Sequence, residues 1–128
     1  MKVIIDTNFL LIPGTLGVDI FSKIREMNPS NKLYIIDKSI DELEKIKKEQ
    51  KKFKKAADLA IQLIDNQKIN IIKTEKVKNV DEIIVEKAAE GYVVATQDKI
   101  LKKTLEDKKI PVILLKQKKY LVIEKNVL

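Results

Sequence analysis

Two short apolar segments of this chain end in the same way. Residues 3–5 lead into Asp6-Thr7-Asn8, and residues 93–95 lead into Thr96-Gln97-Asp98. Runs of apolar, mostly β-branched residues without polar alternation predict strands that are buried on both faces, as in the parallel sheets of α/β proteins. Ligands of such sheets bind beyond the carboxyl ends of the strands. Each run therefore brings an acidic residue to the edge of the sheet where α/β proteins keep their chemistry.

Predicted strands alternate with predicted helices through most of the chain. The strands cover residues 2–5, 33–36, 69–72, 92–96 and 111–115, and residues 120–123 form a short edge strand or a tail. Apolar residues at helical spacing predict helices around 18–27, 51–66 and 98–107. Two further helices start at the capping box Ser39-Ile40-Asp41-Glu42 and at Asn79 or Asp81, the latter closed by Gly91.

This order of elements predicts one architecture. Strands joined by helical crossovers form a parallel sheet with right-handed connections. We expect an α/β fold, a three-layer α/β/α sandwich around a mainly parallel five-stranded sheet. The 128 residues suffice for one domain, residues 1–128, with residues 116–128 as a short C-terminal strand or tail.

The composition excludes several kinds of site. The chain has no Cys and no His, which excludes disulfides, thiolate zinc sites and the commonest general base. Lys and Arg number 26 against 19 Asp and Glu, a net charge of +7. That surplus favours polyanionic partners, although a Lys-rich surface that only maintains solubility explains it equally well. No apolar run approaches the roughly 18 residues of a membrane span, and no secretory leader is visible, so we expect a cytoplasmic protein without a membrane partner.

Four acidic residues are expected at the same rim of the sheet: Asp6, Glu42, Asp81 and Asp98. Each has a local alternative. Asp81 and Asp98 are placed to cap helices or to favour the helix dipole from the first turn, Asp6 to form an Asx-turn, and Glu42 to complete its capping box. Carboxylates gathered at one rim repel one another unless a cation neutralises them. Because all the ligands are oxygens, the expected cation is Mg²⁺ or Mn²⁺.

These motifs together resemble those of the PIN-domain nucleases, a family that includes the VapC-type toxins and related archaeal and eukaryotic rRNA-processing proteins. The resemblance extends over nearly the whole chain, and residues 91–98 are its most specific part. It implies a Mg²⁺- or Mn²⁺-dependent endoribonuclease that hydrolyses single-stranded RNA. The implied catalytic residues are Asp6, Glu42, Asp81 and Asp98; the metal ligands among them are Asp6, Asp81 and Asp98, and Asn8 and Thr96 are supporting polar residues. Glu82 is an alternative to Asp81, and Glu44 a weaker alternative to Glu42.

Two groups of lysines are candidates for RNA contact. The first lies around residues 47–55 and the second near the C-terminus; they comprise Lys47, Lys48, Lys51, Lys52, Lys54 and Lys55, and Lys116, Lys118 and Lys119. For any single lysine of the first group, a solvated helix face is the commoner explanation. Phosphate contacts would weaken with salt and would not depend on RNA sequence.

Several biological roles stay open. A VapC-type toxin would pair with a small antitoxin protein that blocks the acidic pocket, and an antitoxin reading frame directly upstream would favour that role. Residues 91–123 are more similar to the PIN proteins that mature ribosomal RNA, whose substrate is a structured ribosomal precursor. An inactive PIN scaffold that binds RNA or protein is the alternative from another class. A homodimer is expected only because relatives form one, and a glycine-rich phosphate loop is missing after the first strand, which disfavours a nucleotide-binding domain.

Overall fold

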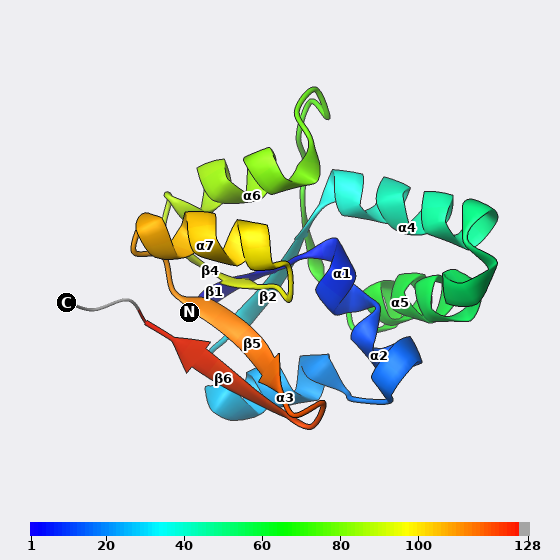
Figure 1. The fold of residues 1–128 in the computed structure, drawn as a ribbon, viewed down its shortest axis with the longest axis horizontal. Helices are drawn as coiled ribbons and strands as arrows, with labels where there is room; N and C mark the ends of the chain where they lie inside the picture. Colours follow the sequence, from blue (N-terminus) through cyan, green and yellow to red (C-terminus); the bar gives the residue numbers. More distant parts are fainter. Residues whose placement is uncertain (126–128) are drawn as a thin grey trace.

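The fold is built on a single sheet of six strands. A computed structural model describes residues 1–125, and its strands lie in the order β3-β2-β1-β4-β5-β6 (Figure 1). They are β1 (Lys2–Ile5), β2 (Lys32–Ile36), β3 (Asn70–Ile72), β4 (Tyr92–Ala95), β5 (Val112–Lys116) and β6 (Tyr120–Glu124). The first five are parallel, as predicted, and β6 runs antiparallel to β5.

The predicted count of five strands is wrong, because the segment after β5 forms a full sixth strand. Gln117 and Lys118 both adopt left-handed backbone conformations, with φ of 52° and 57°. Two such residues in succession reverse the chain tightly enough to form a hairpin. Val112 thus comes to lie opposite Glu124. Residues 126–128 of the expected C-terminal strand or tail lie outside the described residues.

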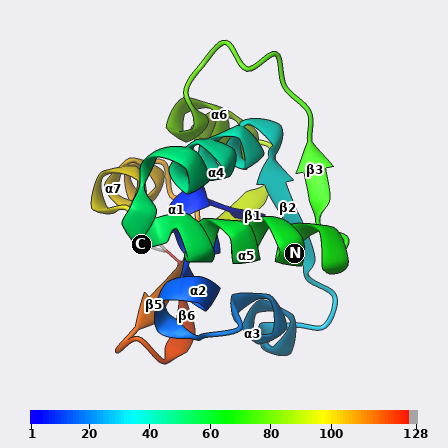
Figure 2. The same ribbon diagram turned by 90° about the vertical axis from the view of Figure 1, so that its right-hand side faces the viewer.

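Helices cover both faces of the sheet and make the expected three layers. Helices α6 and α7 pack on one face, and the other face is covered by the remaining helices, with α4 and α5 side by side (Figures 1 and 2). In chain order they are α1 (Thr7–Leu10), α2 (Ile12–Leu16), α3 (Ile20–Met27), α4 (Asp37–Glu49), the 3₁₀ turn η1 (Lys51–Phe53), α5 (Lys54–Asn66), α6 (Val80–Ala88) and α7 (Lys99–Asp107). No helix in this described part of the chain is long and apolar enough to span a membrane.

The central strand β1 shows why the apolar runs lack polar alternation. Val3 and Ile5 belong to the core on one face of the sheet, whereas Ile4 belongs to the core on the other face. All three side chains are fully buried. Strand β4 divides in the same way, with Val93 and Ala95 on one side and Val94 on the other. A strand packed on both sides needs an apolar residue at every position.

The structure corrects one predicted helix start and confirms another. Helix α4 begins at Asp37, two residues before Ser39, and makes no side-chain cap hydrogen bond. The predicted capping box is therefore wrong, because the buried Ser39 hydroxyl lies inside the helix and contacts another segment. Asn79 caps α6 by accepting a hydrogen bond from the Glu82 amide. The predicted closure of this helix by Gly91 is wrong, because α6 ends at the C-cap Ala89, and Gly91, with φ of 106°, belongs to the turn that leads into β4.

Two short helices, α1 and α2, were not predicted from the sequence. Helix α2 carries Pro13 and Gly14 and packs closely on α5. A Cβ atom at Gly14 would lie 2.4 Å from the Cα atom of Ala56, so only glycine allows this approach. The close packing brings α1, which follows β1 directly, next to α4.

Candidate active site

The centre of the sheet defines a crevice at the carboxyl ends of β1 and β4. The strand order reverses between these neighbours, with β2 and β3 on one side and β5 and β6 on the other. In α/β proteins this reversal is the place where ligands bind, because the connections leave the two strands toward opposite faces. Ile5 pairs with Ala95 in this register, so the residues that follow, Asp6 and Thr96, come to the same edge.

Thr96 links the two acidic residues that follow these strands. Its hydroxyl donates a hydrogen bond of 2.8 Å to Asp6 Oδ2 and accepts one of 3.0 Å from the Asp98 amide. Asp6 Oδ1 accepts a further bond of 2.8 Å from the Thr7 amide. Thr96 is fully buried and Asp6 is 4% exposed, so these contacts hold the Asp6 carboxylate in a fixed orientation.

Glu42 reaches the same place from helix α4. The Thr7 hydroxyl donates a hydrogen bond of 2.5 Å to Glu42 Oε1 and lies 3.0 Å from the Ser39 hydroxyl. The local alternative for Glu42, half of a capping box, is thereby excluded. Thr7 is thus a supporting residue that was not predicted, although its hydroxyl directly after Asp6 was the available signal, whereas Asn8 was predicted in this role. Asn8 accepts only a long bond, 3.4 Å, from the Gln97 amide.

Asp81 and Asp98 stand at the first turns of two helices on the other face. Asp98 caps α7, because its Oδ1 accepts a 2.9 Å bond from the Leu101 amide. Asp81 lies in the first turn of α6 but does not cap it, since Asn79 does. Asp81 lines the hollow described below and Glu82 does not, whereas Glu44 lines a separate hollow with the lysines of α4. The local alternative therefore holds for Asp98 as a helix cap and for Asp81 as an acidic first-turn residue, alongside any catalytic role.

These residues enclose a hollow, which we call the acidic hollow, of about 530 Å³. It is lined by the four predicted acids, by Asn8 and by Glu49 from the end of α4. Among the described residues that line it, Lys45 is the single cation. As predicted, the four acids come from four separate segments of the chain.

Burial and mutual repulsion raise the pKa values of two of these acids. Burial raises the pKa of Asp6 to about 6, and the charges of Asp81 and Glu42 add to it, against the hydrogen bonds from Thr96 and Thr7. Loss of solvent also raises the pKa of Asp81, with further contributions from Asp98 and Glu42. Such shifts mark carboxylates that would be stabilised by a nearby cation.

The donor set suits a hard divalent ion, although the side chains do not form a closed cage. Among residues 1–125, no group of three or more acidic side chains is gathered tightly enough to hold a metal ion. Asp6 and Asp98 also accept hydrogen bonds from the Thr7 and Leu101 amides, which occupy part of the acceptor capacity of both carboxylates. Mg²⁺ keeps several waters and needs only one or two direct carboxylates, so an open set of this kind fits it. Direct ligation by Asp6, Asp81 and Asp98 stays a prediction.

The predicted RNA-contacting lysines fall on different parts of the surface. Lys48, Lys51 and Lys54 line a hollow that shares Glu49 with the acidic hollow, so this group continues the surface away from the site. Lys47 is paired with Asp58 at 3.1 Å. Lys52 and Lys55 are exposed nearby. Lys116 contacts Glu124 at 3.6 Å, and Lys118 and Lys119 lie in the β5–β6 turn, at the bottom of the view and away from α4 at its upper right (Figure 1).

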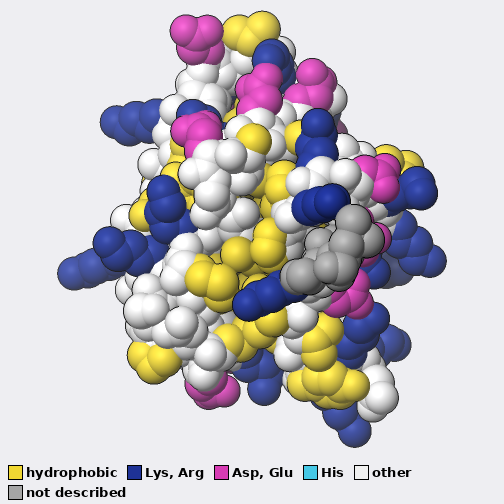
Figure 3. All heavy atoms as spheres, turned by 90° about the vertical axis from the view of Figure 1, so that its left-hand side faces the viewer, with side chains coloured by type: hydrophobic (Ala, Val, Ile, Leu, Met, Phe, Trp, Pro, Cys, Tyr) yellow, Lys and Arg dark blue, Asp and Glu magenta, His cyan; other side chains and the backbone are white. Residues whose placement is uncertain are grey.

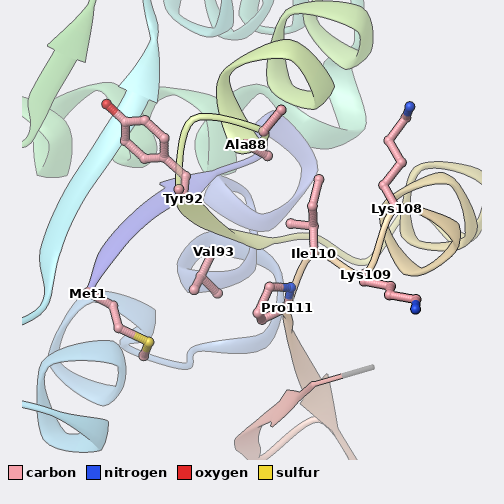
Figure 4. A pocket seen from close by; sticks show the side chains of 10 residues that line it. Met1, Ala88, Tyr92, Val93, Lys108, Lys109, Ile110 and Pro111 are labelled. Atoms are coloured by element: carbon pink, nitrogen blue, oxygen red, sulfur yellow. The ribbon is translucent and has the colours of Figure 1, made fainter. Parts of the chain in front are cut away.

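A second hollow, of about 670 Å³, opens at the amino edge of the sheet. It is lined mainly by apolar and backbone atoms and by Lys108 and Lys109, with Tyr92 on the opposite side from the lysines (Figure 4). The molecular face on this side carries a central hydrophobic patch with Lys and Arg around it (Figure 3). None of its lining residues among those described is acidic. The acidic hollow, although smaller, is therefore the candidate active site.

Comparison with known proteins gives the class of this chain. The model of the PIN like domain family matches residues 3–118, and the chain belongs to that family. It is 34% identical over 129 residues to Ribonuclease VapC4 of Methanocaldococcus jannaschii, with 95% of each chain covered. The solved structure of the PIN domain endonuclease Utp24 has a TM-score of 0.80 at 25% identity, covering 97% of this chain and 91% of that one. A domain of a functionally unknown protein from M. jannaschii shares the fold, with a TM-score of 0.63 at 17% identity and coverage of 99% and 96%. The resemblance seen in the sequence and the predicted α/β sandwich are thus confirmed.

Proposed function

We propose that this protein is a metal-dependent endoribonuclease that hydrolyses phosphodiester bonds of single-stranded RNA. The observation that carries the proposal is the meeting of Asp6, Glu42, Asp81 and Asp98 in the acidic hollow. The names of two relatives, a ribonuclease and a PIN domain endonuclease, support RNA as the substrate and internal cleavage as the reaction.

The roles of the residues follow from their contacts. Asp6, Asp81 and Asp98 would hold Mg²⁺ or Mn²⁺, with Glu42 beside them. The chemistry that such an ion would supply is a water of lowered pKa and neutralisation of the negative charge on the leaving oxygen. Thr96 orients Asp6 and Asp98 together, and Thr7 orients Glu42. No His or Cys is needed, because in this reaction water attacks the phosphorus directly. The expected products therefore carry 5′-phosphate and 3′-hydroxyl ends.

The principal alternative is an inactive scaffold that binds RNA or a protein partner. The burial of Asp6 in a hollow shared with three other acids argues against it, since clustered carboxylates cost stability at neutral pH and a scaffold gains nothing from them. The relative named VapC4 supports a toxin role, in which a small antitoxin would cover the acidic hollow. The likeness to the endonuclease Utp24 supports internal cleavage, and the alternative role in ribosomal RNA processing rests on the resemblance of residues 91–123. An upstream antitoxin gene whose product inhibits cleavage would decide for the toxin.

One cleavage experiment tests the activity. End-labelled single-stranded RNA is incubated with the pure protein in Mg²⁺, in Mn²⁺ and in EDTA. We expect internal cuts with either ion, none in EDTA, and none for Asp6→Asn or Asp98→Asn. Asp19→Asn is the matched control, because Asp19 also caps a helix, α3, but does not line the acidic hollow. Binding of RNA without cleavage in any of the three conditions would establish the scaffold instead, and a 2′,3′-cyclic phosphate end would contradict the direct attack of water.

Metal binding is measurable without activity. An ion that binds only the folded protein raises its melting temperature in proportion to the logarithm of its concentration. We expect Mn²⁺ to raise the melting temperature of the wild type and of Asp19→Asn, and to raise that of Asp98→Asn much less. Equal shifts in all three proteins would remove the acidic hollow as the metal site.

A further inference from the structure

Lys45 is a cation placed in an otherwise acidic hollow. It lies on helix α4, three residues after Glu42 and four before Glu49, and all three residues line the acidic hollow. At about 100° per residue, positions spaced by three, four and seven share one side of a helix. The side of α4 that carries Glu42 toward the site therefore also carries Lys45 to its rim.

The natural ion-pair partner of Lys45 is already occupied. An acid four residues before a lysine is the favourable helical arrangement, and here that acid is Asp41. Asp41 instead contacts Lys76 at 2.8 Å. Among the described residues, Lys45 belongs to none of the ion pairs, although Glu42 and Glu49 are its neighbours on the same helix side.

The loop that carries Lys76 is fixed to the start of α4. Asp37 accepts hydrogen bonds from the Thr74 amide, 2.8 Å, and from the Thr74 hydroxyl, 2.7 Å. Lys38 donates a third bond, of 2.7 Å, to the Lys78 carbonyl. These contacts hold Lys76 over Asp41 and leave the Lys45 ammonium available to another anion.

We propose that Lys45 binds a backbone phosphate of single-stranded RNA at the rim of the acidic hollow and positions the strand for cleavage. This inference rests on the proposed nuclease function. The positive charge of Lys45 offsets the repulsion between the acids of the hollow and the RNA backbone. An ammonium group offers three donors without a fixed geometry, which suits a phosphate whose orientation changes as the strand moves. Lys45 thus acts on substrate position, whereas the acids act on the reacting bond.

The test measures binding in the Asp6→Asn background, so that cleavage does not interfere. A fluorescein-labelled oligouridylate serves as the probe. One phosphate contact on a single strand contributes about 0.7 to the slope of log affinity against log salt, which corresponds to about fivefold in affinity at 0.1 M salt. We expect Lys45→Gln to lose about fivefold and to reduce the slope by about 0.7. Lys45→Arg should retain most of the affinity, and Lys23→Gln on α3 is the control that should change neither.

A second measurement uses the pairing of Lys76 with Asp41. Lys76→Gln frees Asp41 to attract Lys45, and a helical ion pair of this spacing changes an equilibrium by about twofold. We expect Lys76→Gln to weaken RNA binding by about twofold, to have no effect in Lys45→Gln, and to be reversed by Asp41→Asn. An equal loss from Lys76→Gln with and without Lys45 would overturn this part, since Lys76 would then contact the RNA itself.

The outcomes separate the two proposals. If the wild type cuts RNA and the Lys45→Gln change leaves both affinity and salt slope unchanged, the role of Lys45 is overturned and the nuclease stands. If the wild type neither binds nor cuts RNA with Mn²⁺, the proposed function fails and the role of Lys45 fails with it.

Discussion

Replacing Asp6 by Asn removes a charge from a buried position, and we expect it to stabilise the protein at neutral pH. The pKa of Asp6 is about 6 in the folded state and 3.8 for an unperturbed Asp. The folded protein therefore holds this proton more tightly than the unfolded chain. Between pH 3.8 and about 6 the folded state carries more protons, so stability falls as the pH rises through this window.

The magnitude follows from the same two values. A difference of about two pKa units corresponds to roughly 3 kcal/mol, fully present above about pH 6. Asn keeps the acceptor for the Thr7 amide, but its amide group cannot accept the bond from the Thr96 hydroxyl, which costs about 1 kcal/mol. We therefore expect Asp6→Asn to be about 2 kcal/mol more stable than the wild type at neutral pH, and equally or less stable below about pH 4.

The assay is urea denaturation followed by circular dichroism, from about pH 4 to pH 8, with EDTA present so that no ion stabilises the wild type. Asp19→Asn is the control of opposite sign. The pKa of Asp19 is lowered mainly by its hydrogen bond with Ser22, so that its removal should cost stability as the pH rises. The claim that the buried charge of Asp6 destabilises the folded protein is refuted if the stability difference between Asp6→Asn and wild type does not change with pH. It is also refuted if Asp6→Asn is the less stable protein at neutral pH.

Three further changes test other parts of the structure. Thr96→Val removes the buried hydroxyl that joins Asp6 and Asp98. We expect the free energy of unfolding, measured by urea denaturation, to fall by about 2 kcal/mol and most of the cleavage activity to be lost. Full activity would show that this hydroxyl does not orient the acids. Gly14→Ala places a Cβ 2.4 Å from the Ala56 Cα. We expect it to lower stability by about 2 kcal/mol despite the better helix propensity of Ala. An unchanged melting curve would contradict the close approach of α2 and α5. Burial would raise the pKa of Asp37, but two hydrogen bonds from Thr74 and one from the Lys38 amide outweigh burial and lower this pKa. The Asp37 carboxylate therefore stabilises the protein above about pH 4, and this contribution is lost as the pH falls further. Asp37→Asn should be destabilised at neutral pH and approach the wild type in acid, which thermal melts at neutral and at acid pH would check.

The sequence was most informative where one physical requirement dominated. Strands β1 and β4 are packed on both faces, so every position is apolar and the run is visible without any partner. The acidic residue that follows each strand could be placed at the sheet edge from the sequence, because a strand of this kind must end there. Asp81 was harder, since Glu82 is adjacent and only the helix orientation, set by the Asn79 cap, decides which of the two lines the hollow.

Other features depended on contacts between distant segments. Helices α1 and α2 are too short to show periodicity, and Pro13 and Gly14 resemble a loop until α5 is seen packed against them. The Ser39 segment has the local form of a capping box, but its hydroxyl contacts Thr7, which is 32 residues away. Lys45 could not be distinguished from the other lysines of α4, because its availability depends on Lys76 holding Asp41.

The dispersal of the acids along the chain has a consequence for protein synthesis. Asp6 emerges from the ribosome early, but Thr96 and Asp98, which orient and complete the site, come about ninety residues later, and β5 must follow before β4 is covered. A nascent or truncated chain therefore carries most of the charged residues without the arrangement that would make them reactive. If the proposed activity is correct, the cell's RNA is exposed to it only after the whole sheet has formed, and any mutation that unfolds the sheet also silences the nuclease.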